Sequence, residues 1–339
     1  MSIRVAINGF GRIGRMVFRR MVSEKDIDIV AVNASYTPQQ LAHMLKYDSV
    51  HGKFPYTVDY TENSLLVDGK ETRLVAERDA SKLPWAEMNI EVVIEATGKF
   101  RSKEAAAAHL TAGAQKVLIT APAVNEDVTV VMGVNEEKYD YEKHHVISNA
   151  SCTTNCLAPF VKVINDKYGI ENGLMTTIHS YTNDQKLLDN MHKDPRRARA
   201  AALSMIPTST GAARALSVVI PEMAGKLNGL AIRVPTPDAS LVDLVVTLRE
   251  NVTVEQINAT LREASEGQLK GILGYTEEPL VSIDYVGNEH SSTIDALSTM
   301  VIGDKQLKIL AWYDNEWGYS CRIVDVAKYI SKAYSDKRK

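Results

Sequence analysis

The chain has 339 residues, and its content of 45% hydrophobic and 24% charged residues is that of an ordinary globular protein. A formal net charge of -3 gives no overall attraction for nucleic acid or an acidic membrane surface, so neither is expected as a partner. A chain of this length predicts two domains. There is no run of about 18 apolar residues, and the first residues enter a strand-like segment rather than a signal-like leader, so a cytoplasmic location is expected.

The first half of the chain alternates strand-like and helix-like segments. Buried strands are predicted from the β-branched and apolar runs at Ser2 to Asn8, Ile27 to Val32, Val92 to Ala96, Lys116 to Thr120 and Val128 to Met132. Helices are predicted at Arg12 to Ser23, Gln39 to Leu45 and Ser102 to Ala112. This alternation is typical of α/β folds with a mostly parallel, doubly wound sheet covered on both faces, here over residues 1–150.

The second half has a different texture. A helix is predicted at Ser151 to Tyr168, and strands at Leu174 to His179, Gly229 to Val234, Leu241 to Leu248 and Ile309 to Tyr313. Alternating apolar and polar residues favour a largely antiparallel sheet, so an α+β catalytic domain is predicted over residues 151–314. The amphipathic segment Ser320 to Ala333 predicts a helix that packs back, so residues 315–339 complete the first domain, with a solvated tail at Ser331 to Lys339.

A long polar segment, Tyr181 to Met205, separates two of the strands in the second half. It is rich in Arg and Lys and shows no clear helical or strand period. Structureless loops of this length are uncommon inside compact domains, and those that occur usually have a function. A functional loop is therefore favoured here.

A glycine signature follows the first strand. Gly9, Gly11 and Gly14 fit G-x-G-x-x-G, in which a tight turn, close approach to a pyrophosphate and close helix packing each exclude a Cβ. Glycine turns are common, but this one lies between a strand and a helix and a further strand follows. The pattern therefore predicts a Rossmann-type dinucleotide-binding domain, with the cofactor phosphates at the helix N-terminus.

The acid that usually ends the second strand of such a domain is missing. The chain reads Asn33, Ala34, Ser35 where a carboxylate would accept hydrogen bonds from the ribose of NAD and repel the extra phosphate of NADP. With alanine there the repulsion is absent, and Ser35 offers a hydroxyl. NADP, or use of both cofactors, is favoured; the alternative is that Ala34 is a tolerated loop residue and NAD binds through its other contacts.

Cys152 lies at the start of a predicted helix, within SNASCTTNCLAP. The positive end of the helix dipole and free backbone N–H groups stabilise a thiolate there, and the same N–H groups can hold an oxyanion. Cysteines are often simply buried, and that interpretation is preferred for Cys156 and Cys321. Three cysteines provide no disulfide framework, and no zinc-like spacing accompanies them, so no metal is expected.

His179 is the candidate base for this thiol. It lies in the strand-like TTIHSYTNDQ at the edge of the long loop, where an imidazole could meet Cys152 in space. A lone histidine is usually structural. The other histidines lack a comparable setting: His43, His51, His109, His144, His145, His192 and His290.

Eight blocks of sequence resemble phosphorylating glyceraldehyde-3-phosphate dehydrogenase, from about residue 2 to residue 332. They are INGFGRIGR, KYDSVHG, SNASCTTNCLAP, HSYTNDQ, RRARAAA, PTSTGAA, RVPTPDASLVDL and WYDNEWGYS. The resemblance implies that Cys152 attacks the aldehyde of glyceraldehyde 3-phosphate and that His179 lowers the thiol pKa and takes the hydroxyl proton as hydride leaves. Inorganic phosphate then cleaves the thioester to give 1,3-bisphosphoglycerate.

The resemblance also implies roles for further residues. The substrate phosphate would be surrounded by Thr182, Asp184 and Arg233, and the attacking phosphate by Ser151, Thr153, Arg197, Thr210 and Gly211. The cofactor would be lined by Gly9, Phe10, Gly11, Arg12, Ile13, Gly14, Asn33, Ala34, Ser35, Arg78, Thr97, Gly98, Thr120, Asn315 and Tyr319. Arg196, next to Arg197, is more simply an interface or surface charge.

The sequence is most similar to the bacterial branch that prefers NADP and serves gluconeogenesis, which also reads NASY at Asn33 to Tyr36. Asn190 and Met191 depart from the Leu-Pro typical of NAD-specific relatives, again near a cofactor ribose. A homotetramer is implied, with Tyr181 to Met205 at the inter-subunit surface. Three alternatives remain: erythrose-4-phosphate dehydrogenase, a cysteine-dependent acyl transferase or hydrolase, and a nucleotide-sensing binding protein.

Overall fold

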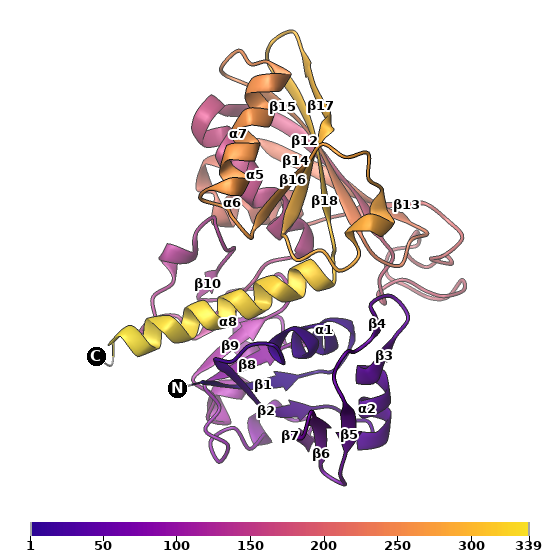
Figure 1. Ribbon diagram of the computed structural model, residues 1–339, viewed down its shortest axis with the longest axis vertical. Coiled ribbons are helices and arrows are strands. Elements are labelled where there is room, and N and C mark those ends of the chain that lie inside the picture. The colour runs from indigo at the N-terminus through magenta and orange to yellow at the C-terminus, as the bar shows by residue number, and fades with distance from the viewer. Residues whose placement is uncertain (1, 338–339) are drawn as a thin grey trace. The chain divides into compact units, whose positions relative to one another are not determined.

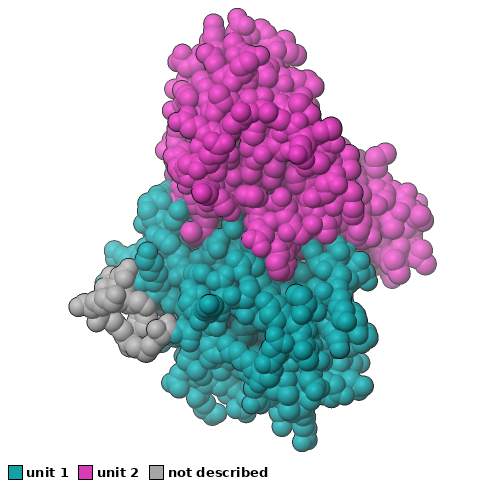
Figure 2. Space-filling model, in the orientation of Figure 1, with its two compact units in different colours: residues 1–130, 136–150, 320–339 teal, residues 131–135, 151–319 magenta. Residues whose placement is uncertain are grey.

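The computed structural model describes residues 2–337, with side chains described through residue 332. It divides into two compact units, coloured separately in Figure 2: residues 1–130, 136–150 and 320–339, and residues 131–135 and 151–319. Most of the tail predicted at Ser331 to Lys339 therefore lies outside the described side chains. Within the described part of the chain, no helix is long and apolar enough to cross a membrane.

The first unit is built on a nine-stranded sheet in the order β10-β11-β9-β8-β1-β2-β7-β6-β5 (Figure 1). Pairs from β10 to β7 are parallel, and the last two pairs are antiparallel. Its strands are β1 (Ile3–Asn8), β2 (Ile27–Asn33), β5 (Val58–Tyr60), β6 (Ser64–Val67), β7 (Lys70–Val75), β8 (Val92–Glu95), β9 (Lys116–Ile119), β10 (Val128–Thr129) and β11 (Val146–Ser148). The small pair β3 (Tyr47–Asp48) and β4 (Gly52–Lys53) forms a separate ribbon.

Helices of this unit flank the parallel strands. They are α1 (Arg12–Met21), α2 (Pro38–Lys46), α3 (Lys103–Ala106) and α4 (Ala108–Thr111). Helix α8 (Trp317–Lys337) begins in the second unit and belongs to the first from Ser320 onward. The parallel order and flanking helices confirm the doubly wound, Rossmann-type fold class.

Two predicted elements of this unit differ from the structure. The helix predicted over Ser102 to Ala112 is interrupted at Ala107, between α3 and α4. The strand predicted at Val128 to Met132 stops at Thr129, because the backbone N–H of Val131 donates to the side chain of Asn135, at 2.8 Å, and a turn begins. Local turn chemistry there outweighs the strand propensity of the valines.

The second unit has a seven-stranded mixed sheet in the order β13-β14-β12-β15-β18-β17-β16. Four of its six strand pairs are antiparallel, as the predicted α+β class requires. Its strands are β12 (Ile170–Ser180), β13 (Ile206–Ser209), β14 (Leu227–Val234), β15 (Ser240–Leu248), β16 (Leu273–Thr276), β17 (Ser292–Ile302) and β18 (Gln306–Tyr313). Helices α5 (Cys152–Tyr168), α6 (Ala212–Val219) and α7 (Val254–Glu266) pack against it (Figure 1).

The central strands of this sheet show why one face can be buried. Along β15, buried and half-buried residues alternate without interruption from Ser240 to Leu248. Strand β12 alternates in the same way over its middle, where Met175 is buried and Leu174 exposed. The period of two places one set of side chains under the helices and the other set on the opposite face.

Candidate active site

Cys152 is the first residue of helix α5. The side chain of Ser151 caps the helix by accepting a hydrogen bond from the backbone N–H of Thr154, at 3.0 Å. The thiol is therefore placed at a helix N-terminus, where N–H groups of the first turn have no partner within the helix. The cysteine is half-buried, whereas Cys156 and Cys321 are buried, and all three are free.

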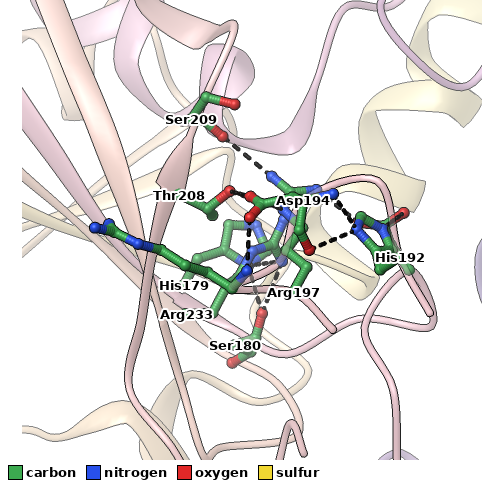
Figure 3. Close-up of polar contacts among 10 residues, drawn as sticks. His179, Ser180, His192, Asp194, Arg197, Thr208, Ser209 and Arg233 are labelled. Carbon is green, nitrogen blue, oxygen red and sulfur yellow. Dashed lines mark hydrogen bonds and ion pairs between the residues drawn. The ribbon is translucent and has the colours of Figure 1, made fainter. Parts of the chain in front are cut away.

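His179 reaches this thiol from strand β12. Its Nε2 lies 3.5 Å from the Sγ of Cys152. The parallel pairing of β12 with β14 sets His179 beside Arg233, and Arg233 Nη1 lies 2.9 Å from His179 Nδ1. Figure 3 shows His179, Ser180 and Arg233 converging at this point. A thiol, an imidazole and a guanidinium group thus share one site.

The hydrogen bonds of the imidazole indicate where its proton lies. Nδ1 lies 2.7 Å from the carbonyl oxygen of Ser180, which can only accept, and 2.9 Å from Arg233 Nη1, which can only donate. The shorter contact assigns the hydrogen to Nδ1, because Arg233 has the Ser180 carbonyl as an acceptor of its own. Arg233 donates to the same carbonyl at 2.9 Å. In a neutral ring the Nε2 lone pair is then free to face the thiol of Cys152. This arrangement suits a base that removes the thiol proton.

Burial controls the titration of both groups. Burial, reinforced by the positive charges of Arg233 and Arg197, lowers the pKa of His179 to about 3, so the imidazole is neutral near pH 7. Burial raises the pKa of the Cys152 thiol, while Arg233 and the hydrogen bonds of Thr153 oppose that rise. The resemblance assigns the lowering of the thiol pKa to His179. In the structure the positive charge beside the sulfur belongs to Arg233.

Tyr313 connects the two elements that carry this pair. Its hydroxyl lies 2.9 Å from the Oγ1 of Thr153, on α5, and 2.9 Å from the Oγ1 of Thr177, on β12. Its ring meets the ring of His179 edge to face, with centroids 6.0 Å apart. Tyr313 therefore fixes the start of the helix against the strand, which holds Cys152 and His179 at their separation.

Arg197 donates hydrogen bonds to three residues of the long loop and strand β13, and its Nε also lies 3.8 Å from the carboxylate of Asp194. Its Nη1 donates to Asp184 at 2.6 Å, its Nε to Thr208 at 2.9 Å and its Nη2 to the carbonyl of Ser209 at 3.1 Å (Figure 3). Burial alone would raise the pKa of Asp184, but hydrogen bonds from Arg197 and His192 outweigh it and hold the pKa below its usual value. The resemblance divides Asp184 and Arg197 between two phosphate sites. The structure pairs them directly.

The remaining predicted phosphate residues have simpler settings. Thr210 and Gly211 precede α6, and the Oγ1 of Thr210 accepts the N–H of Ala212 at 3.2 Å. Thr182 is half-buried in the loop after β12. Arg196 is exposed, and its side chain donates to the carbonyl of Pro207 at 3.3 Å.

The glycine loop of the first unit fits a dinucleotide. An added Cβ would lie 2.1 Å from the carbonyl oxygen of Gly9 if placed on Gly14, and 2.8 Å from the backbone nitrogen of Thr97 if placed on Gly9. On Gly11, the N-cap of α1, it would meet no described atom within 4 Å, so the backbone there faces open space. The turn is closed on its inner side and open at the helix N-terminus, as phosphate binding requires.

Other predicted cofactor residues lie at the carboxyl ends of the strands in this unit. Asn33 ends β2, and Ala34 and Ser35 follow it. The N–H of Ala34 donates to the carbonyl of Val75 at 2.9 Å, and the exposed Arg78 lies three residues after Val75, in the loop that follows β7. Thr97 and Gly98 follow β8, and Thr120 follows β9. Phe10 is buried against Phe18, and Ile13 is half-buried in α1.

Arg12 has a firm partner in the protein. Its guanidinium group donates to both oxygens of Asp48, and Arg15 lies 3.8 Å from the same carboxylate. Burial alone would raise the pKa of Asp48, but the hydrogen bonds from Arg12 and from the N–H groups of His51 and Val50 hold it well below its usual range. Arg12 therefore lines the glycine loop as half of an ion pair.

The last two predicted cofactor residues lie in the second unit. Asn315 is buried, and its Oδ1 accepts the hydroxyl of Ser240 at 2.6 Å, while Ser240 accepts the N–H of Ser180 at 3.1 Å. Ser240 therefore links the Asn315 amide to Ser180, the residue that follows His179. Tyr319, in the first turn of α8, is buried.

Comparison with known proteins identifies the family. Residues 3–103 match the model described as glyceraldehyde 3-phosphate dehydrogenase, NAD binding domain, and residues 151–315 match that of the C-terminal domain. Similar proteins are glyceraldehyde-3-phosphate dehydrogenase of Geobacillus stearothermophilus, 61% identical over 98% of this chain and 99% of the relative, and glyceraldehyde-3-phosphate dehydrogenase 2 of Bacillus subtilis, 58% identical over 98% and 97%. A third, from Trichormus variabilis, is 56% identical over 98% and 99%.

The chain belongs to the glyceraldehyde-3-phosphate dehydrogenase family. It is therefore an NAD(P)-dependent phosphorylating dehydrogenase, as the sequence predicts. Membership of this dehydrogenase family excludes the alternative of a cysteine-dependent acyl transferase or hydrolase that uses no redox cofactor. The two matched segments correspond to the dinucleotide-binding fold and the α+β fold of the structure.

Sequence reasoning missed several residues that shape this dehydrogenase. Tyr313, Ser240 and Asp48 carry the contacts described above, and each lies in a quoted block without being singled out. Glu95 and His109 are both buried, and His109 Nε2 lies 3.1 Å from Glu95 Oε2. In the sequence, His109 lacks a setting comparable to that of His179. Tyr313 and Glu95 lie at or next to the end of a predicted strand, which is a local signal. Asp48 follows a predicted helix, His109 lies inside one and Ser240 precedes a predicted strand, so the sequence offers no shared signal for these three.

Proposed function

We propose that the chain interconverts glyceraldehyde 3-phosphate, inorganic phosphate and NAD(P)⁺ with 1,3-bisphosphoglycerate and NAD(P)H through a thioester on Cys152. The observation that carries this proposal is the 3.5 Å approach of His179 Nε2 to the Cys152 Sγ at a helix N-terminus. The similarity to glyceraldehyde-3-phosphate dehydrogenases of Bacillus subtilis and Geobacillus stearothermophilus supports the choice of substrate.

The steps follow from the positions of these two groups. As Sγ bonds to the aldehyde carbon, Nε2 of His179 takes the thiol proton and returns it to the carbonyl oxygen, giving a thiohemiacetal. Nε2 then removes the hydroxyl proton while hydride leaves the carbon, giving the thioester. The bound cofactor supplies the hydride acceptor. A phosphate oxygen attacks the thioester carbon, the carbon–sulfur bond breaks, and the thiolate regains its proton from His179.

Two arginines supply the charge for the phosphate groups. Arg233 would bind the substrate phosphate together with Thr182 and Asp184, and Arg197 would bind the attacking phosphate with Ser151, Thr153, Thr210 and Gly211. Because Arg233 and Arg197 lower the pKa of His179, an imidazolium beside them is unfavourable. A bound phosphate dianion would offset both charges, so substrate binding would make His179 a stronger base.

The residues after strand β2 favour NADP as the cofactor, and NAD is the alternative. Strand β2 ends at Asn33 and is followed by Ala34 and Ser35, so no carboxylate projects from these positions toward a ribose 2′-phosphate. The exposed Arg78 lies in the loop that pairs with Ala34 through Val75. A missing negative charge and a nearby positive one both favour NADP. A reductive, gluconeogenic direction is proposed on the same ground.

Ala34→Asp is expected to lower the ratio of kcat/KM for NADP to that for NAD by about 10- to 100-fold, because its carboxylate would repel the 2′-phosphate and accept the ribose hydroxyls. The matched control is Ala34→Asn, which has nearly the same size and no charge and should shift the ratio far less. Steady-state kinetics with both cofactors measure the ratio. A wild-type ratio in the aspartate variant would place the ribose elsewhere.

Erythrose-4-phosphate dehydrogenase is the second candidate within the enzyme class, since it shares the thiol and cofactor machinery but releases a free acid. Retention of the attacking-phosphate residues Arg197, Thr210 and Gly211 favours the phosphorylating enzyme over this candidate. The test compares kcat/KM for glyceraldehyde 3-phosphate, with and without inorganic phosphate, using NADP and NAD in parallel. Activity that does not depend on phosphate would favour erythrose 4-phosphate as substrate.

Self-association as a homotetramer and a cytoplasmic location complete the proposal. The long loop exposes apolar side chains, Leu187 and Met191 at 84% and 88%, and the sheet face away from the helices exposes Leu174 at 67%. Contact with another subunit would remove these apolar side chains from water. Three free cysteines suit a reducing compartment.

We expect a particle of four times the 37.4 kDa chain mass by light scattering after size-exclusion chromatography. Leu174→Arg should shift this population toward smaller species, because it places a charge on the apolar sheet face. Lys305→Arg, at an exposed turn, is the matched control and should leave the mass unchanged. A monomeric wild-type chain would contradict the proposal.

A further inference from the structure

A chain of buried hydrogen bonds runs across the carboxyl ends of three neighbouring strands in the first unit. Glu95 ends β8, Asn8 ends β1 and Asn33 ends β2, and these strands are adjacent in the sheet. His109, from α4, and Trp85 extend the chain beneath the sheet. All five residues are at most 9% exposed. Buried polar groups must be paired, so the direction of each bond can be worked out.

The direction begins at Trp85, whose Nε1–H can only donate. It lies 3.1 Å from His109 Nδ1, so Nδ1 accepts and carries no hydrogen. The neutral ring must then carry its hydrogen on Nε2, which lies 3.1 Å from the Oε2 of Glu95 and donates to it. Trp85 thereby fixes one tautomer of His109.

Glu95 receives four donors. Besides His109, its Oε2 accepts Asn8 Nδ2 at 2.5 Å, and its Oε1 accepts the backbone N–H of Thr97 at 2.8 Å and the Thr97 hydroxyl. His109 Nε2 and Asn8 Nδ2 lie 3.3 Å apart because they share one acceptor. Only a carboxylate, which accepts at both oxygens, satisfies this set.

Glu95 therefore sets the orientation of the next two amides. Since Asn8 directs its Nδ2 to Glu95, its Oδ1 faces Asn33 and accepts Asn33 Nδ2 at 2.7 Å. Asn33 Nδ2 also donates to the carbonyl of Glu77 at 2.8 Å, and its Oδ1 accepts the N–H of Glu77 at 3.0 Å. The amide of Asn33 thus forms two hydrogen bonds with the backbone of Glu77, one as donor and one as acceptor.

We propose that Glu95 is a positioning residue that sets the pocket for the adenosine ribose of the cofactor, acting through Asn8 and Asn33 on the loop at Glu77. This inference rests on the proposed placement of the ribose at Ala34 and Ser35. Both hydrogens of the Asn33 amide are used within the protein and its oxygen accepts from Glu77, so we assign its contribution to the ribose pocket to the position of Glu77. Glu95 also orients Thr97, the first residue after β8.

The change Glu95→Gln should break the chain at its centre. Glutamine offers one oxygen and one NH₂ group. If the oxygen keeps the two Thr97 donors, the NH₂ group meets the N–H groups of His109 and Asn8. If Asn8 turns its amide over, its NH₂ meets that of Asn33 and the grip on the loop is lost. If the glutamine amide is reversed, its oxygen accepts from His109 and Asn8, but its NH₂ group meets the backbone N–H of Thr97, which loses its acceptor. Donor therefore faces donor in every arrangement, and Trp85 prevents His109 from changing its tautomer.

The full-length Glu95→Gln chain is expected to bind ADP-ribose, which lacks nicotinamide, about tenfold more weakly than wild type. The KM for both cofactors should rise by a similar factor, more than kcat falls. Calorimetry with ADP-ribose measures the first effect. Leu83→Ala is the control: Leu83 belongs to the same buried cluster as Trp85 but makes none of these bonds, so it should lower Tm while binding stays within about twofold of wild type.

Trp85→Phe combined with Glu95→Gln separates this chain of bonds from a merely structural role. Without the Trp85 donor, His109 can carry its hydrogen on Nδ1 and accept at Nε2, from the new NH₂ group or from Asn8. The double variant should therefore bind ADP-ribose several-fold more tightly than Glu95→Gln alone. Packing damage alone predicts the opposite, because the double variant removes more buried volume.

The inference is overturned if folded Glu95→Gln binds ADP-ribose as wild type does, or if the double variant binds more weakly than the single one. If neither variant folds, Asn33→Leu tests the other end of the chain; wild-type binding there would also overturn it. The NADP proposal is decided separately, by the NADP-to-NAD ratio of the wild-type enzyme, and a preference for NAD would leave the outcome for Glu95 readable.

Discussion

Replacing Cys152 with serine is expected to abolish aldehyde oxidation, lowering kcat by at least roughly 10⁴-fold, while cofactor binding stays intact. A hydroxyl has no accessible anion near neutral pH, so no covalent intermediate can form at the start of α5. Stopped-flow detection of NAD(P)H gives the rate, and cofactor titration gives Kd. Kd should not change, because the glycine loop that fits the cofactor phosphates lies in the first unit.

Cys156→Ser is the matched control for this experiment. Cys156 lies one turn further along the same helix, is fully buried, and its Sγ is 3.8 Å from the carbonyl of Ala311. The change is chemically identical but removed from the position beside His179. Activity close to wild type in Cys156→Ser, together with loss in Cys152→Ser, assigns the chemistry to one thiol; substantial activity in the Cys152 variant would remove it from the mechanism.

Much of the fold was predictable because local patterns and tertiary needs agree. The glycine turn between β1 and α1 is specified by Gly9 and Gly14, where a Cβ would clash with the backbone, and the α5 helix starts where Ser151 provides a cap. The alternation along β15 likewise follows from burial of one sheet face. In such segments the sequence periodicity and the packing require the same structure.

The helix predicted over Ser102 to Ala112 shows where this agreement ends. Five alanines favour a continuous helix, yet the structure interrupts it at Ala107. His109, in the second piece, is completely buried and bonds both Trp85 and Glu95. The hydrogen bonds that His109 makes to Trp85 and Glu95 stabilise the interrupted helix by more than the helix propensities of the alanines, which are a few tenths of a kcal/mol per residue, would favour a continuous one.

The candidate site divides in the same way. Cys152 and His179 could be proposed from residue type and local context, because a thiol at a helix start and a histidine at a strand end are local features. The pairing of Arg197 with Asp184 and the chain from Glu95 to Asn33 join residues that are 13 and 62 positions apart along the sequence. The chain from Glu95 to Asn33 depends on the order of the strands in the sheet, and the Arg197–Asp184 pair depends on the path of the long loop. One sequence without structure contains neither.

His179→Asn is expected to lower kcat/KM by about 10²- to 10⁴-fold, the usual contribution of a general base. Asparagine keeps a polar side chain on β12 but offers no nitrogen that can take the thiol proton. Because burial raises the pKa of Cys152, few thiolates form without this base near pH 7. The rate of Cys152 alkylation by iodoacetamide should therefore fall in the variant, with cofactor Kd unchanged.

The pH dependence of His179→Asn distinguishes loss of a base from loss of structure. Hydroxide can replace the base as pH rises toward the raised pKa of the thiol, so the alkylation deficit should shrink between pH 7 and about pH 9. Hydride transfer should stay slow, because it also needs a base for the hydroxyl proton. His43→Asn, on the exposed side of α2, is the matched control and should behave as wild type. A deficit independent of pH in both assays would show that His179 holds Cys152 in place without accepting its proton.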